Sequence, residues 1–415
     1  MTLDPVHFDG IARLARRIEH DVDDADHREF AETVWNEFLD PLYHDGTPVL
    51  EPLGDLKKRR VDVEDVALRG DAFDTCHGLD SGTINPTTFK NGLVLDIAQA
   101  AMSSVPSTLD LHRSRTVIAA VHSNDATLRL DEEWDRFDEG FSRGKVIHAP
   151  SVGRYEKGVV HALSLYLAES EHALAHADEV ADLLVLDGPL YPKGILNWLD
   201  QHPELAELLM ERDVRQVVQN YVHLVERFVE REVPLVGFVK NMSTKAMTRA
   251  LREKTMVGWA NDAGFFSTVL ERRELVDGEY ERLTDSLSIT NWFVSRAGSD
   301  RVFAADNDEL DIERELDPEA YEVTFCVVYD PREDMIYKVE APYAVTKDRT
   351  TRERIELQVL KDVAAERGPP LAVGKADELA RISLVEKASL IRTLEETFDS
   401  DRDRSYDQLR WNEEY

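Results

Sequence analysis

The segment DLLVLDGPLY, residues 182–191, constrains the fold more than any other stretch of this chain. Four consecutive apolar residues followed by Asp-Gly-Pro predict a strand that is buried on both faces and ends at a sharp turn. Such a strand lies in the middle of a sheet covered by helices, so the segment predicts an α/β fold. Asp187 would then emerge at the carboxyl edge of the sheet, where open α/β sheets bind ligands. Its alternative role is to start the turn or to cap the next helix.

A second acid has the same setting about a hundred residues earlier. Residues 75–83, TCHGLDSGT, predict a short strand that ends at Asp80 and is followed by a Ser-Gly turn. The apolar run that begins at Gly92 predicts a strand returning antiparallel to the first, and residues 115–122 predict a third strand. We therefore expect Asp80 and Asp187 to end neighbouring buried strands and to meet at one edge of the sheet.

Candidate partners for these two acids come from neighbouring predicted elements. Residues 156–177 predict a long helix that carries Glu169 and Glu171 on its polar face, and residues 233–239 predict a strand that ends at Lys240. Three carboxylates at one edge repel each other unless a cation lies among them, and oxygen ligands favour magnesium or manganese. Such an ion activates water and stabilises charge on phosphate oxygens, and Lys240 would add a fixed positive charge. The pattern therefore points to metal-dependent phosphodiester hydrolysis.

The net charge of −33, from 82 acidic and 49 basic residues, is spread along the whole chain. A dispersed acidic surface is typical of proteins from extreme halophiles, because molar salt screens its self-repulsion; a protein that avoids polyanions is the alternative. The acidity therefore does not exclude nucleic acid as a partner. Lys245, Arg249 and Arg252 lie four and three residues apart, on one face of a predicted helix. This basic face favours phosphate binding, with a face of intrahelical salt bridges as the alternative.

The chain lacks the marks of a secreted or membrane protein. No run of eighteen apolar residues occurs, and the N-terminal residues MTLDPVHFDG lack the basic and apolar regions of a signal peptide. Two cysteines, Cys76 and Cys326, are too few for a disulfide scaffold or a cysteine zinc site. We therefore expect a cytoplasmic protein without a membrane partner.

Four motifs in this order resemble the NurA nuclease family: Leu-Asp80-Ser-Gly, Leu-Leu-Val-Leu-Asp187-Gly-Pro-Leu, Leu-Val-Gly-Phe-Val-Lys240-Asn-Met-Ser and Tyr337-Lys-Val-Glu-Ala-Pro. The resemblance implies an RNase H-like mixed sheet core flanked by helices, with helical elements at both ends of the chain. It also implies a manganese-dependent deoxyribonuclease with 5′-to-3′ exonuclease activity, and single-stranded DNA endonuclease activity as a further option. The family works as a homodimer with the hexameric HerA helicase in DNA end resection and double-strand break repair. DNA, a HerA-type helicase and a second copy of the chain are therefore the implied partners.

The resemblance also assigns roles to individual acids and to one lysine. Asp80 and Asp187 match the two strand-end aspartates that bind metal in the family. Glu169 matches the family's helix glutamate, which also binds metal, and Glu171 is the alternative two residues on. Lys240 matches the catalytic lysine after the Val-Gly strand. The resemblance implies manganese as the cofactor, with magnesium as an option.

The resemblance leads to two further assignments, and each of them has an alternative. Asp262 matches an aspartate that opens the next helix and belongs to the catalytic set, with N-capping as the alternative. The family has a histidine within a Pro-Leu…Ala-His segment, and we assign Lys375 to its place. Either a second metal is then held differently, or the lysine binds phosphate directly. The predicted DNA-binding residues are Lys240, Lys245, Arg249, Arg252 and Lys375.

The sequence predicts three parts. Residues 1–69 form an N-terminal helical segment and connection, residues 70–398 form a NurA-like nuclease domain, and residues 399–415 form an acidic tail expected to be disordered.

Two other functions remain open at this point. The first is a different phosphoryl-transfer enzyme on an RNase H-like fold, such as a sugar-kinase-like ATPase, although no GxxxxGK[ST] or GxGxxG run occurs. The second is a catalytically impaired partner protein that docks on a translocase ring, which the missing histidine favours.

Overall fold

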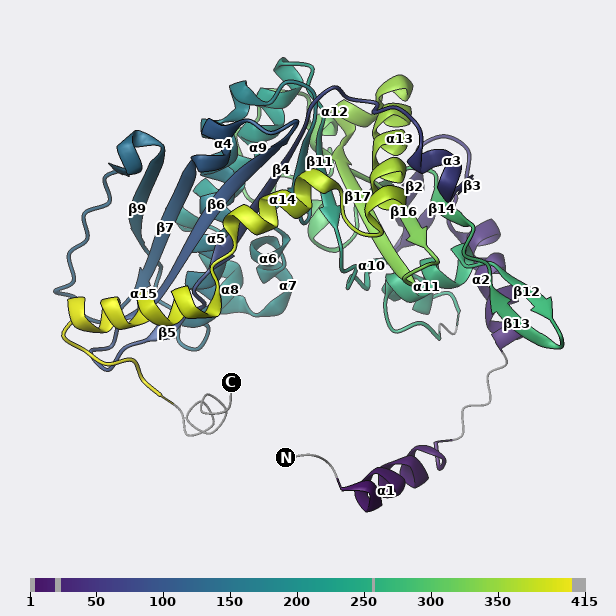
Figure 1. Cartoon of the computed structure of the whole chain (residues 1–415), viewed down its shortest axis with the longest axis horizontal. Coiled ribbons are helices and arrows are strands. Elements are labelled where there is room, and N and C mark those ends of the chain that lie inside the picture. Colours follow the sequence, from purple (N-terminus) through teal and green to yellow (C-terminus); the bar gives the residue numbers. More distant parts are fainter. Residues whose placement is uncertain (1–3, 19–23, 256–257, 405–415) are drawn as a thin grey trace.

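The computed structural model describes residues 4–18, 24–255 and 258–404, and one mixed sheet of fifteen strands forms the centre of this described part (Figure 1). The strand order along its main path is β1-β2-β15-β16-β17-β11-β10-β4-β6-β7-β9-β8. The strands on this path are β1 (Leu42–His44), β2 (Thr47–Pro52), β4 (Cys76–Thr83), β6 (Val94–Val105), β7 (Arg115–His122), β8 (Asp135–Phe137), β9 (Ser142–His148), β10 (Leu184–Asp187), β11 (Leu235–Val239), β15 (Phe293–Ser295), β16 (Val323–Asp330) and β17 (Met335–Pro342). Off the path, β14 (Ser286–Thr290) pairs with β16 and β3 (Lys58–Asp62), and β5 (Thr87–Thr88) pairs with β6.

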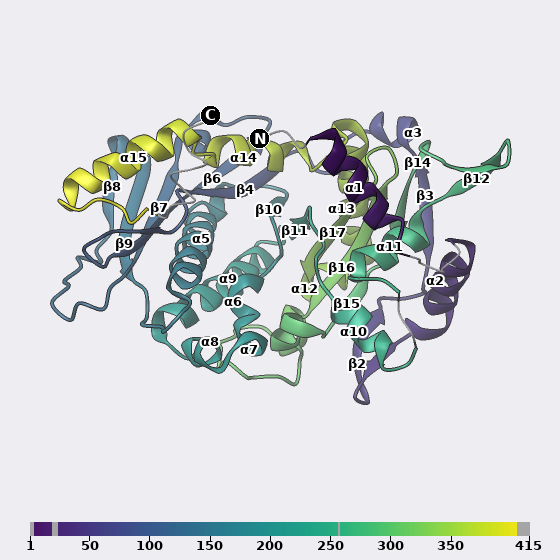
Figure 2. The same ribbon diagram turned by 90° about the horizontal axis from the view of Figure 1, so that it is seen from below.

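Helices cover both faces of this sheet, so the predicted mixed α/β fold is confirmed (Figure 2). The helices are α1 (Pro5–Ala15), α2 (Asp24–Phe38), α3 (Val63–Ala67), α4 (Leu109–Arg113), α5 (Glu156–Ala175), α6 (Lys193–Leu196), α7 (Trp198–Gln201), α8 (Pro203–Leu208), α9 (Arg212–Glu230), α10 (Ala246–Arg252), α11 (Asp262–Leu270), α12 (Tyr343–Thr346), α13 (Arg349–Glu366), α14 (Leu371–Ala380) and α15 (Leu384–Thr397). A separate hairpin of β12 (Arg273–Val276) and β13 (Glu279–Arg282) projects from one end of the molecule (Figure 1).

The short strand β10 lies at the centre of the sheet, as its apolar sequence predicted. It pairs in parallel with β4 on one side and with β11 on the other. Leu184, Val185 and Leu186 are all buried, because helices pack on both faces here. The turn after Asp187 passes close over β11, where a Cβ atom on Gly237 would collide with the backbone of that turn. A glycine at this position therefore lets the chain leave the sheet directly after Asp187.

Strand β4 presents its two faces to different helices, because successive side chains alternate across a strand. On one face, Cβ atoms on Gly78 and Gly82 would collide with the backbone carbonyls of Ala372 and Ala380 in α14. These glycines allow α14 to cross β4 at close range, and Asp80 lies between them on the same face. The opposite face of β4 packs toward α5, as Figure 2 shows. The alternation thus places Asp80 directly under α14.

One predicted boundary is corrected by the structure. The strand that carries Asp80 does not end there but continues to Thr83, so Asp80 lies inside the strand. Near the C-terminal end, α14 and α15 are two helices separated by a break at residues 381–383. Residues 124–145 include β8 and the start of β9 at one edge of the sheet.

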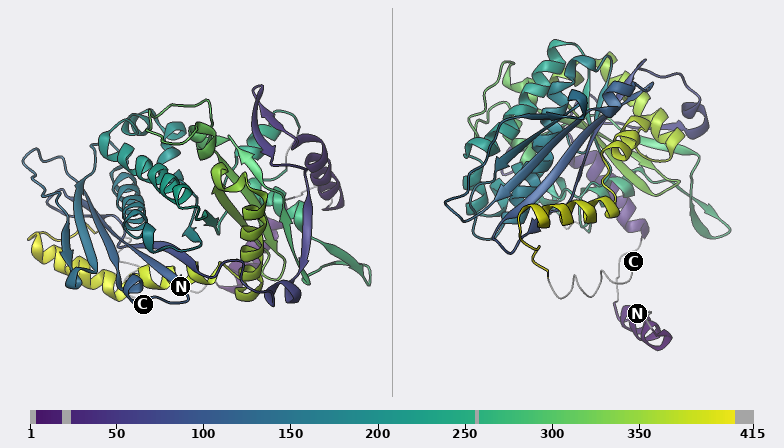
Figure 3. Two further views of the ribbon diagram at one scale, coloured as in Figure 1. Left: turned by 90° about the horizontal axis from the view of Figure 1, so that it is seen from above. Right: turned by 60° about the vertical axis from the view of Figure 1, so that its left-hand side comes forward.

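The two predicted ends of the chain are also more ordered than their composition indicated. Within residues 1–69, β1 and β2 extend the sheet through β15, and β3 pairs with β14. At the other end, α15, the last yellow helix, lies across the blue strands of the sheet (Figure 3), and the main chain of Lys90 donates to the Asp401 carbonyl at 2.9 Å. The start of the predicted acidic tail is therefore bound to the domain. Residues 405–415 of that tail lie outside the described residues, as do residues 1–3 and 19–23.

Candidate active site

Three aspartates from three different elements converge at the carboxyl edge of β10. Oxygens of Asp80, Asp187 and Asp377 all lie within 4.8 Å of one another. Leu79 in β4 lies opposite Leu186 in β10, so the next residues, Asp80 and Asp187, are side by side at this edge. Asp377 reaches them from α14, which crosses β4 above Asp80. The structure thus brings together the two aspartates that the sequence singled out and adds a third.

Asp80, Asp187 and Glu169 share an environment that disfavours their negative charge. Burial, together with the charges of Asp187 and Glu169, raises the pKa of Asp80 to about 8. Burial also raises the pKa of Asp187, although Lys240 opposes this increase. The pKa of Glu169 rises to about 7, again mainly through burial. A cluster of oxygen donors that retains protons near neutral pH fits a hard divalent cation, which would replace those protons.

Glu169 approaches this edge from α5, on the face of the sheet opposite α14. Its Oε1 atom accepts a hydrogen bond from Ser81 Oγ at 2.6 Å, and its Oε2 atom accepts one from Tyr221 at 2.9 Å. The side chain of Glu171 is used elsewhere, since it forms an ion pair with Arg143 at 3.2 Å. Of the two glutamates left open by the sequence, Glu169 is the one whose charge acts on Asp80.

The two glutamates provide a matched test within one helix. We expect Glu169→Gln to lower kcat for metal-dependent DNA cleavage by about 100-fold, because it removes a charge next to the aspartates. Glu171→Gln should stay within about twofold of wild type, since a partly exposed ion pair contributes little. Steady-state rates for both variants in manganese test this expectation. Equal losses in both variants would contradict the placement of Glu169 at the site.

Lys240 lies where the sequence placed it, directly after β11. Its Nζ atom forms an ion pair with Asp187 Oδ2 at 2.5 Å, and about a third of its side chain, 32%, remains exposed. A lysine held by a site carboxylate and still open to solvent can also contact a phosphate oxygen. The position of Lys240 is therefore compatible with its predicted role.

Asp262, which the sequence grouped with the catalytic acids, is not among the carboxylates that meet at this edge. It is buried, and its carboxylate accepts hydrogen bonds from the hydroxyl of Thr244 and from the main-chain amides of Met247 and Thr248. These contacts tie the first turn of α10 to α11. The N-cap of α11 is Asn261, so the alternative role of Asp262 as an N-cap is also wrong.

The predicted DNA-binding residues do not form one surface. Lys245 and Arg249 line a cavity of about 370 Å³, whereas Arg252 lies outside its lining and donates to the carbonyl of Trp259 at 3.4 Å. Lys375 is also away from the aspartates, because its Nζ atom reaches Ser107 Oγ at 3.4 Å. Lys375 therefore does not join the three aspartates, and its match to the family histidine stays a prediction.

Asp377 is the site residue that the sequence reasoning missed. Asp377 lies two positions after Lys375 in α14. Two positions along a helix correspond to about 200° of rotation, which explains why Lys375 and Asp377 point to different places.

A shallow cavity of about 410 Å³ opens directly beside Asp80 and Asp377. Arg381 and Lys387, from the break before α15 and from α15 itself, also line it. Two cations next to three carboxylates provide contacts for phosphate groups on either side of a bound cation. Neither residue was singled out from the sequence, because each is an ordinary charged residue at a helix boundary.

Comparisons with known proteins were made for the whole chain. Residues 74–382 match a family model described as the NurA domain. The crystal structure of the NurA nuclease from Sulfolobus solfataricus is similar at a TM-score of 0.52 with 13% sequence identity, over 96% of this chain and 98% of that one. A structure of NurA bound to dAMP and manganese gives a TM-score of 0.44 with 12% identity, over 98% and 99% of the two chains. No curated protein matches this sequence, and no described helix is long and apolar enough to cross a membrane.

Proposed function

This chain belongs to the NurA family, and on that premise we propose that it is a metal-dependent deoxyribonuclease that hydrolyses DNA phosphodiester bonds at the edge of β10. The observation that carries the proposal is the convergence of Asp80, Asp187 and Asp377 within 4.8 Å. Asp80 and Asp187 are partly buried and have raised pKa values, which favours a bound cation, and the exposed Asp377 adds a third oxygen donor.

The donor set supports manganese or magnesium as the cofactor, because all three groups offer oxygen atoms. Asp80, Asp187 and Asp377 would hold the ion, which when bound supplies an activated water and stabilises charge on phosphate oxygens. Glu169 keeps Ser81 and Tyr221 oriented next to this position through its two hydrogen bonds. These contacts fix the geometry before DNA binds.

The cationic residues around the aspartates position the substrate. Lys240 Nζ lies against Asp187 Oδ2 and can donate a second hydrogen bond to an oxygen of the scissile phosphate. Arg381 and Lys387 line the cavity on the other side of Asp80, where the next phosphate of the strand would lie. DNA is thus held between two groups of cations, in spite of the net charge of −33.

Further parts of the proposal rest on the family alone. They are 5′-to-3′ exonuclease activity, single-stranded endonuclease activity, a homodimer, and cooperation with a HerA-type helicase in DNA end resection and repair. A halophilic setting rests on the dispersed acidic charge, and a cytoplasmic setting is part of the proposal as well. The alternative of a catalytically impaired docking protein is less favoured, because Asp377 completes a group of three carboxylates with Asp80 and Asp187.

A cleavage assay on single- and double-stranded DNA tests the proposed function. In molar salt with manganese, the purified full chain should release nucleotides from both substrates, and a chelator in excess should stop the reaction. Cleavage that persists in the chelator would contradict the metal site. No cleavage under any of these conditions would support the docking protein instead.

A further inference from the structure

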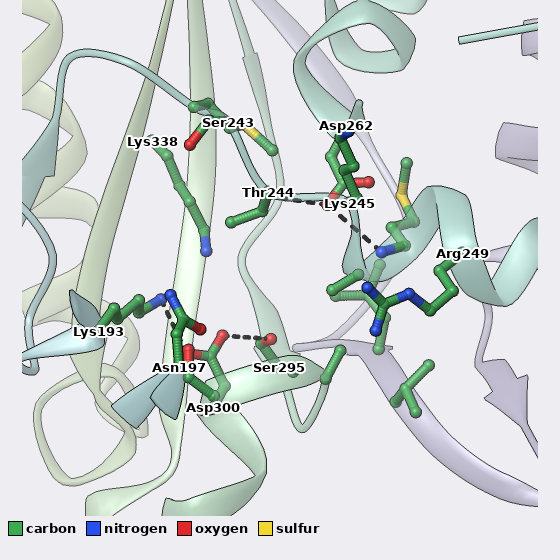
Figure 4. A pocket seen from close by; sticks show the side chains of 18 of the residues that line it. Lys193, Asn197, Ser243, Thr244, Lys245, Arg249, Asp262, Ser295, Asp300 and Lys338 are labelled. Atoms are coloured by element: carbon green, nitrogen blue, oxygen red, sulfur yellow. Dashed lines mark hydrogen bonds and ion pairs between the residues drawn. The ribbon is translucent and has the colours of Figure 1, made fainter. Parts of the chain in front are cut away.

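A second cavity, of about 370 Å³, is lined by residues between 242 and 249, which follow Lys240 in the chain, and by Lys338 (Figure 4). We propose that this cavity binds the terminal phosphate of a DNA strand whose neighbouring phosphodiester bond lies at the aspartates. The proposal rests on the proposed nuclease function and deepens it, because it makes a phosphorylated strand end the preferred substrate.

The innermost part of the cavity is a buried group of ionised side chains. Lys193 Nζ forms ion pairs with Asp300 at 2.8 Å and Glu340 at 2.6 Å, and Lys338 Nζ forms one with Glu340 at 2.6 Å. Although burial opposes its ionisation, these two lysines lower the pKa of Glu340 to about 2. The ammonium group of Lys338 points into the cavity in Figure 4, and only 4% of this residue is exposed.

Two further cations that line the cavity, Lys245 and Arg249, have no partner among the described residues. Among the described residues, none forms a hydrogen bond or an ion pair with the ammonium group of Lys245 or with the guanidinium group of Arg249. Arg249 extends toward the cavity in Figure 4. Acids outnumber bases by 82 to 49 in this chain, so most cations find a carboxylate nearby. Unpaired cations beside a cavity therefore favour an anionic ligand.

Hydroxyl and amide groups complete the lining with neutral hydrogen-bond donors. They belong to Asn197 and Ser243, since the hydroxyls of Thr244 and Ser295 already donate to Asp262 and Asp300. A set of lysine, arginine, hydroxyl and amide donors matches the oxygens of a phosphate group.

The cavity is close enough to the aspartates to hold a neighbouring phosphate of the same strand. Lys338 lies opposite Val239 in the pairing of β17 with β11, and Lys240 follows Val239 directly. Ser243 is three residues beyond Lys240, and three extended residues span at most about 11 Å. This span corresponds to at most about three nucleotides of a bound strand, since the rise per nucleotide is about 3.4 Å or more.

The shape of the cavity favours the end of a strand over its interior. Lys338 lies on the sheet between walls from residues 193–201, 242–249 and 295–300. An internal phosphate carries nucleotides on both sides, so both would have to enter the cavity for it to reach Lys338. A terminal phosphate enters from one side only, and it carries about −1.5 to −2 charges at neutral pH rather than about −1. Its charge and its shape both suit the site.

Binding of three oligonucleotides of one sequence to the full chain, without divalent metal, tests the proposal. One has a 5′-phosphate, one has a 3′-phosphate, and one has hydroxyls at both ends. Fluorescence anisotropy should show that wild type binds one phosphorylated form about tenfold more tightly than the hydroxyl form. Arg249→Gln should remove this preference, whereas Arg349→Gln, an exposed arginine paired with Glu353 on α13, should keep it.

The outcomes separate the two proposals. Equal binding of all three oligonucleotides, or a preference that persists in Arg249→Gln, overturns the terminal-phosphate site. The phosphorylated form that binds more tightly identifies which end of the strand enters the cavity. The same oligonucleotides are then cleaved with manganese. Cleavage without any preference for a terminal phosphate overturns only the cavity assignment, whereas no cleavage of any DNA overturns the nuclease function on which it rests.

Discussion

Asp187→Asn should lower kcat for metal-dependent DNA cleavage by about 10³-fold or more while the chain folds normally. The substitution keeps the size of the side chain but removes the central negative charge between Asp80 and Lys240, so a divalent ion loses a ligand. We expect the fold to persist, because the carboxylate of Asp187 has a raised pKa and therefore costs the folded state energy when it is ionised. Single-turnover rates in manganese measure the effect.

A matched control is available on the surface. Asp55→Asn removes an acid that is exposed and paired only with Lys57, so it should cleave DNA at the wild-type rate. Circular dichroism and thermal unfolding should be close to wild type for both variants. An Asp187→Asn protein that cleaves DNA at the wild-type rate in manganese would show that the three aspartates are not the metal site.

The stability of the metal-free protein should fall as the pH rises from about 4 to about 8. An unfolded aspartate loses its proton near pH 3.9, whereas burial and neighbouring charges raise the pKa of Asp80 in the folded chain to about 8. Between these values the folded state binds more protons than the unfolded state, so raising the pH favours unfolding. Glu169, whose pKa is raised to about 7, adds to the effect in the same direction.

Manganese should reverse this trend, because it replaces the protons and binds only the folded arrangement. At pH 8, adding manganese should raise the Tm of wild type by several degrees or more. Asp80→Asn should have a higher Tm than wild type without metal and should lose most of the response to manganese. Thermal scans at constant high salt, with and without a chelator, provide the measurement. A wild-type Tm that is independent of manganese at pH 8 would contradict a cation among these acids.

The parts of the fold that the sequence predicted are those with strong local signals. The apolar run before Asp187 can only be satisfied inside a covered sheet, and the long helix that carries Glu169 is a run of 20 residues without a helix-breaking proline. The convergence of Asp80 and Asp187 followed from the parallel pairing of two such strands. These features depend on few residues and on general rules of packing.

The features of the site that the sequence did not predict depend on contacts between segments that are far apart in the chain. Asp377 joins the site only because Gly78 and Gly82 allow α14 to cross β4 closely, and no local pattern around Asp377 indicates this. Asp262 does not join the three aspartates for a related reason. Its carboxylate accepts three hydrogen bonds from residues just before and within the first turn of α10. Carboxylates have the same sequence signature in both roles, and only the tertiary contacts distinguish them.

The crossing of α14 over β4 also determines when during its synthesis this protein can act. Asp80 and Asp187 leave the ribosome well before Asp377, which lies near the C-terminal end of the chain. A nascent chain therefore has a partial set of metal ligands and no closed site until α14 has docked on the two glycines. The three carboxylates cannot meet before α14 has been synthesised, and local detachment of α14 in the folded protein would take Asp377 away from the other two.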